Sequence, residues 1–151
     1  MPIRQTTSNA DLDRFIENHV KRVVDSVIYR LSYIGEKVVN QARDTNKRTF
    51  TDQTGNLRSS IGYVIVSDGQ IVRESSFELS EKGTDRITGQ SKGRSYAERL
   101  AQQFPDGIVL IVVAGMNYAT YVSAKGLDVL DSAELLAQRE IPKMLERLGL
   151  K

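Results

Sequence analysis

Apolar residues recur at steps of three or four along the N-terminal part of the chain, with several adjacent pairs, from Leu12 to Ala42. This spacing places them on one wide stripe of an amphipathic α-helix. Ser8 and Asp11 form a capping-box pattern that predicts where the helix begins, and Asn46 predicts where it ends. We expect residues 1–8, ahead of the helix, to be a flexible N-terminal arm.

The predicted helix is longer than a small domain is wide. About 35 residues at 1.5 Å each give about 50 Å, against a diameter of about 30 Å. A break at Gly35 would shorten the helix; without it, part of the stripe projects and requires a partner. We therefore expect contacts between subunits. Val23, Val27 and Leu31 belong either to such a contact or to the core of the single chain, and the pattern leaves both open.

A β-hairpin follows the helix. Residues 51–61 are polar and read as a turn that leads into a short helical turn. The β-branched runs 63–66 and 71–79 then flank Ser67-Asp68-Gly69-Gln70. An Asp-Gly pair between two such runs is a strong signal for a tight hairpin turn.

The segment from Ser80 to Ser95 is rich in Gly, Ser, Thr and charged residues, and Ile87 is its one large apolar residue. We expect residues 80–95 to be a mobile surface loop that extends the hairpin. A short helix from Tyr96 to Phe104 should follow, ended by Pro105-Asp106-Gly107.

Two further elements complete the predicted fold. The continuous apolar run Ile108–Ala114 predicts a central strand that is buried on both faces. Residues 127–148 show a second amphipathic helical pattern, with Asp131 and Glu134 placed to cap its start. Pro142 should kink or divide that helix.

This order of elements predicts the α+β class. We expect one domain over residues 1–151, with a long N-terminal helix, a small antiparallel sheet with an extended hairpin, and a C-terminal helix packed on the sheet. The length suits a single domain.

The composition argues against several classes of function. The 151 residues are 40% hydrophobic and 26% charged, with a formal net charge of +2, which alone argues for neither nucleic acid nor an anionic membrane as a partner. The chain has no Cys and one His, which excludes disulfides and thiolate chemistry and makes His-based sites improbable. The apolar run 108–114 is too short to span a bilayer, and the N-terminus has no secretory signal pattern. We expect a soluble protein in a cytosol-like compartment.

No catalytic, cofactor-binding or metal-binding residues are predicted. Residues 88–95 resemble a phosphate-binding loop only loosely, because Lys92 precedes Gly93 instead of following a second glycine. His19 fits the edge of the helical stripe better than it fits a catalytic base. Tyr63, Tyr118 and Tyr121 fit the edge of the core or a subunit interface. An enzyme with an unrecognised carboxylate site is the least favoured reading.

One local cluster of positive charge stands at the end of the first helix. It comprises Arg43, Lys47 and Arg48, with Arg58 nearby. A solvated helix end explains it. The alternative is a small nucleic-acid-binding module that uses Arg43, Lys47, Arg48 and the Lys92–Arg94 loop, with affinity that falls steeply with salt.

Two motifs in order resemble a bacteriophage family. Residues 54–61, Thr-Gly-Asn-Leu-Arg-Ser-Ser-Ile, lie after the long helix and before the hairpin, and resemble a signature of tail-component or tail-completion proteins at the head–tail junction of long-tailed phages. Tyr118-Ala119-Thr120-Tyr121-Val122 resembles the family's later Tyr-Ala-x-Tyr-Val. The acidic residue that usually follows is absent, since residues 123–126 read Ser-Ala-Lys-Gly.

The resemblance implies a non-enzymatic virion structural protein of the head–tail connector, with a tail-completion or neck role. Similar proteins are small α+β subunits that form rings, commonly of six, and such a ring would contact other connector and tail proteins. The protein would be made in the host bacterial cytoplasm, would become part of the virion, and would meet nucleic acid at most through the axial channel. No cofactor and no membrane are implied.

Overall fold

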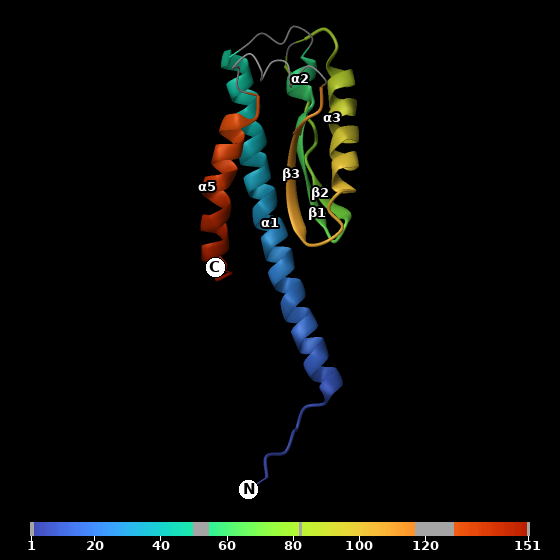
Figure 1. The fold of residues 1–151 in the computed structure, drawn as a ribbon, viewed down its shortest axis with the longest axis vertical. Helices are drawn as coiled ribbons and strands as arrows, with labels where there is room; N and C mark the ends of the chain where they lie inside the picture. Colours follow the sequence, from blue (N-terminus) through green and yellow to red (C-terminus); the bar gives the residue numbers. More distant parts are fainter. Residues whose placement is uncertain (1, 50–54, 82, 117–128, 151) are drawn as a thin grey trace.

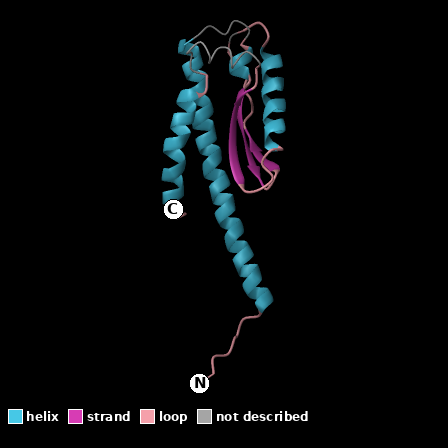
Figure 2. Cartoon of the chain, viewed as in Figure 1, coloured by secondary structure: helices cyan, strands magenta, loops and turns pink. Residues whose placement is uncertain are grey.

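The fold is described here from a computed structural model over residues 2–49, 55–81, 83–116 and 129–150. Over these residues the chain forms helices around a small antiparallel sheet, which confirms the predicted α+β class (Figures 1 and 2). The elements are α1 (Asn9–Thr49), α2 (Asn56–Ser59), β1 (Ile61–Ser67), β2 (Gln70–Glu74), α3 (Arg86–Ala101), β3 (Ile108–Ala114) and α5 (Asp131–Arg147).

The elements stack in layers. Helix α3 covers one face of the sheet and α1 covers the other, while α5 lies beside α1 on the side away from α3 (Figure 1). Alternate residues of β1 serve the two faces: Ile61, Tyr63 and Ile65 pack with α1, and Val64 and Val66 pack on the α3 side. Helix α5 packs chiefly on α1, and its apolar side chains share a core cluster with those of β1 and β3. The prediction that this helix packs on the sheet is therefore met in part, because α1 is its main neighbour.

The strand order is β2-β1-β3, with β1 antiparallel to both neighbours. The prediction that Ile108–Ala114 is the central strand is therefore wrong: within the described sheet it is an edge strand, and β1 is central. The prediction failed because β3 is partly buried on both faces, by α3 on one side and by α1 and α5 on the other. An edge strand covered in this way carries the same continuous apolar run as a central strand.

Helix α1 begins as predicted, because Ser8 caps it. The Asp11 N–H donates to Ser8 Oγ at 3.1 Å, and Ser8 Oγ donates to Asp11 Oδ2 at 2.7 Å. The helix then continues for 41 residues, about 60 Å, past the predicted end at Asn46 and without a break at Gly35. Gly35 has a packing role instead, since a Cβ there would lie 2.9 Å from the ring of Tyr63.

The hairpin forms at the predicted turn. Asp68 and Gly69 have φ angles of 48° and 81°, as a type I′ turn requires. Strand β2 ends at Glu74, however, earlier than the predicted 79, and the ladder is irregular between Ile65 and Val66. Residues 75–80, here called the strap, leave the sheet and cross to α3 without regular structure.

The predicted mobile loop at 80–95 is wrong, because α3 begins at Arg86, ten residues before the predicted start at Tyr96. Its buried face consists of small residues one turn apart, Gly89, Gly93, Ala97 and Ala101. Such a face carries no large apolar residue for periodicity to detect, and it lets the helix backbone approach α2 and β1 closely. Asp85 caps the helix by accepting from the Thr88 N–H at 3.4 Å.

Helix α5 runs undivided through Pro142. Its N-cap is Leu130, without a side-chain cap, so Asp131 and Glu134 lie in the first turn instead of capping it. The Tyr-Ala-Thr-Tyr-Val motif at 118–122 lies outside the described residues.

Candidate interaction surfaces

The signature segment that follows α1 is a structural hub. Gly55, at a φ of 74°, opens α2, and Leu57 is fully buried. Asn56 Oδ1 accepts from the Gly89 N–H at 2.6 Å, which ties α2 to α3. Asn56 Nδ2 donates to Asp85 at 3.5 Å. The segment's composition therefore serves local packing.

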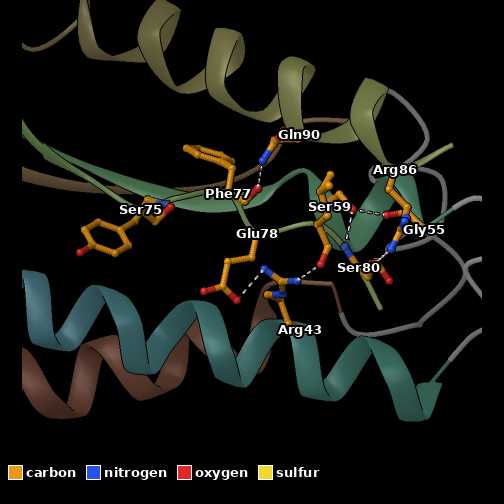
Figure 3. A network of polar contacts seen from close by, with 11 residues as sticks. Arg43, Gly55, Ser59, Ser75, Phe77, Glu78, Ser80, Arg86 and Gln90 are labelled. Carbon is orange, nitrogen blue, oxygen red and sulfur yellow. Dashed lines mark hydrogen bonds and ion pairs between the residues drawn. The ribbon is translucent and has the colours of Figure 1, made fainter. Parts of the chain in front are cut away.

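Hydrogen bonds from this hub and from α3 hold the strap in place (Figure 3). Ser59 Oγ donates to the Gly55 carbonyl at 2.7 Å and accepts from the Ser80 N–H at 2.8 Å. Arg86 Nη1 donates to the Ser80 carbonyl at 2.6 Å, and Gln90 Nε2 donates to the Phe77 carbonyl at 2.7 Å. Residues of α2 and α3 therefore hold the strap by hydrogen bonds. No sequence pattern predicted this arrangement.

An apolar stripe on the N-terminal part of α1 has no neighbour within the described chain. This part of the helix projects beyond the sheet and α5 (Figure 1). Phe15 is 71% exposed and Ile16 is 57% exposed, with Leu12 and Val20 exposed on the same side of the helix. We call these four residues the α1 stripe. Further along the helix, Val27 and Leu31 are buried in the core of the single chain, whereas Val23 is half-buried.

A second apolar surface is an open groove between β3 and α5. It has a volume of about 280 Å³, with Val38 of α1, Leu110 and Val112 of β3, and Ala137 and Ile141 of α5 among its lining residues. Glu134 is its one charged lining residue. We call it the β3–α5 groove. No sequence pattern predicts this groove, because it follows from the edge position of β3.

Of the tyrosines and the histidine selected from the sequence, the structure describes Tyr63 and His19, which lie in different parts of the fold. Tyr63 is buried against Gly35, and burial, together with the Glu36 carboxylate, raises its pKa to about 12. Tyr118 and Tyr121 lie outside the described residues. His19 is exposed on the projecting part of α1.

The structure separates Arg43 from Lys92 and Arg94, three of the positive residues of the nucleic-acid alternative. Arg43 turns inward: its guanidinium lies 3.9 Å from the Glu78 carboxylate and donates to the Leu79 carbonyl at 3.4 Å, and burial lowers its pKa. Lys92 and Arg94 are exposed on α3, on the far side of the sheet from α1. The side chains of Lys47 and Arg48 lie outside the described part of the chain. Arg43 therefore does not form one surface with Lys92 and Arg94.

Among the described residues, no group of three or more His, Asp and Glu side chains is placed to hold a metal ion. A search of the same residues finds no helix with the length and apolar character needed to cross a membrane. Comparison with protein-family models, with curated proteins and with solved structures finds no match for this chain.

Proposed function

We propose that the protein is a non-enzymatic structural subunit of a phage head–tail connector, with a tail-completion or neck role, and that it assembles as a ring. A ring of six is favoured, placed between head and tail in the virion after synthesis in the host bacterial cytoplasm. Its partners are further copies of itself and other connector and tail proteins.

The observation that carries the proposal is the α1 stripe. Four large apolar side chains exposed along one side of a projecting helix cost free energy in water, and such patches mark association sites. The order of elements also agrees with the family resemblance: a long helix, the Thr-Gly-Asn-Leu signature, a hairpin and a closing helix.

A cyclic ring needs two different complementary faces on each subunit. The α1 stripe offers one face, and the β3–α5 groove offers a second apolar face of different shape. The stripe lies on a continuous helix that projects away from the groove of its own chain, so docking has to occur between copies. Stripe-into-groove contact is heterologous and closes into a ring when the rotation per subunit divides a full turn.

Light scattering of the purified chain across concentration, with negative-stain imaging of any large species, tests this proposal. We expect one discrete mass at high concentration and closed rings in the images. A mass that stays at the 16.9 kDa of one chain up to millimolar concentration would contradict self-assembly.

A further inference from the structure

A cleft between α1 and α5 gathers positive charge and aromatic rings on the described surface. It has a volume of about 160 Å³; Tyr29, Arg30 and Tyr33 line it from α1, and Lys143 and Arg147 line it from α5. We propose that this cleft binds the phosphodiester backbone of nucleic acid. The proposal goes beyond the proposed function, since subunits can form a ring without any nucleic-acid site.

Arg30, Lys143 and Arg147 form no close salt bridge within the described chain, and Lys143 interacts with Glu140 only at longer range. Lys143 and Arg147 stand one turn apart on α5, where like charges repel. Arg147, in the last turn, also interacts favourably with the helix dipole, but this does not account for Arg30, which faces them from another helix.

The one acidic residue of the cleft is already neutralised. Glu140 Oε2 accepts from Lys37 Nζ at 3.1 Å, and its Oε1 lies 3.5 Å from Arg139 Nε. The hydrogen bond from Lys37 holds the pKa of Glu140 below its ordinary value, so the carboxylate stays ionised beside Lys37 and Arg139. An anion entering the cleft therefore meets a net positive field.

The tyrosines favour nucleic acid over a small anion. Tyr29 is 69% exposed and Tyr33 is 67% exposed, one turn apart on α1 beside the cations. Lys37 lies 5.7 Å from the centre of the Tyr33 ring and helps to hold it. Exposed aromatic rings beside a positive groove are typical of sites where phosphates pair with cations while bases or sugars stack on the rings.

Fluorescence anisotropy with a labelled 15-nucleotide single strand, and with the same sequence as a duplex, tests the proposal. For three phosphate contacts, the slope of log affinity against log salt should be about −2 for the single strand and about −3 for the duplex. The variant Arg30→Ala/Lys143→Ala/Arg147→Ala should lose at least tenfold in affinity at 25 mM salt, with a slope near zero.

The matched control is Lys92→Ala/Arg94→Ala/Arg99→Ala, which removes three exposed cations from α3. It should retain affinity within about twofold, and circular dichroism melting should show that both variants fold. Tyr29→Ala should weaken the single strand about fivefold and the duplex less than twofold, because only unpaired bases stack. Absence of binding by the wild-type chain at 25 mM salt, or equal losses in the two triple variants, would overturn the proposal. Neither outcome bears on ring formation, which the chain's mass reports separately.

Discussion

Asn56 and Gly89 meet backbone to backbone, although 33 residues separate them. The Gly89 N–H donates to Asn56 Oδ1 at 2.6 Å, and a Cβ at Gly89 would collide with the Asn56 carbonyl oxygen. One turn on, a Cβ at Gly93 would collide with the Ser60 carbonyl oxygen, and Gly115 lies against Gly93. The hub after α1, the helix α3 and the end of β3 can approach this closely only because these positions carry no side chain.

The close approach of Gly93 to Ser60 predicts that Gly93→Ala destabilises the fold. Alanine in place of glycine favours a helix by about 0.8–1.0 kcal/mol, but overpacking against the backbone costs about 1–3 kcal/mol and forces a shift. Because a Cβ at Gly93 would lie 2.4 Å from the Ser60 backbone oxygen, we expect the upper part of that cost, and the free energy of unfolding in urea titration should fall by about 1–2 kcal/mol. Ser95→Ala, at an exposed position of the same helix, serves as the control and should change it by less than about 0.5 kcal/mol. A Gly93 variant more stable than the wild type would refute the close packing.

The hydrogen bond between Ser80 and Ser59 predicts a second stability effect. Ser59→Ala removes the acceptor of the buried Ser80 N–H, and an unsatisfied buried donor costs about 1–3 kcal/mol. Chemical denaturation should show that loss, while Ser76→Ala, on the exposed side of the strap, should be nearly neutral. Similar stabilities for the two variants would mean that the strap does not depend on Ser59.

Burial of Tyr63 predicts an alkaline loss of stability. The pKa of Tyr63 is raised from 10.0 to about 12, so above pH 10 the unfolded chain loses this proton while the folded chain keeps it. The contribution is complete below pH 10 and is lost as the pH rises toward 12. Thermal melts from pH 9 to 12 should fall more steeply for the wild type than for Tyr63→Phe. Parallel curves would show that Tyr63 is not protected from deprotonation.

The absence of cysteine makes a direct crosslinking test of stripe-into-groove docking possible. Ile16→Cys and Ile141→Cys chains, mixed and oxidised mildly, should give a mixed disulfide dimer on non-reducing gels. The control pairs Lys21→Cys, on the polar side of α1, with Ile141→Cys and should crosslink far less. Equal crosslinking of the two pairs would argue against the groove as the receiving surface.

The parts of the fold that sequence predicts are those built on large apolar side chains. The helix α1 is predicted by the helical spacing of apolar residues such as Leu31, Ile34 and Val38. The hairpin is predicted by Asp68-Gly69, because its tight turn requires positive φ angles. Helix α3 escapes prediction because its buried face is glycine and alanine. The edge position of β3 escapes as well, since an apolar run reports burial and not strand order.

The surfaces were only partly predictable. The excess length of α1 indicated an unpartnered stripe, and Phe15 and Ile16 confirm that its apolar side chains are exposed in the single chain. The β3–α5 groove and the cleft around Arg30 depend on how α5 lies against α1, which no local pattern encodes. Arg43 shows the converse: a cationic residue in a positive cluster proves to be committed to Glu78 and the strap.

The central claim is that the α1 stripe joins copies of the chain, and the most direct test compares the masses of two variants by sedimentation. Phe15→Glu/Ile16→Glu places two negative charges in the stripe, and Lys21→Glu makes the same change of net charge on the polar side of the helix. Both sites are exposed, so both chains should fold with wild-type stability within about 0.5 kcal/mol. We predict that Lys21→Glu assembles like the wild type, whereas the stripe variant stays a monomer at every concentration. Assembly of the stripe variant to the wild-type mass would contradict the claim.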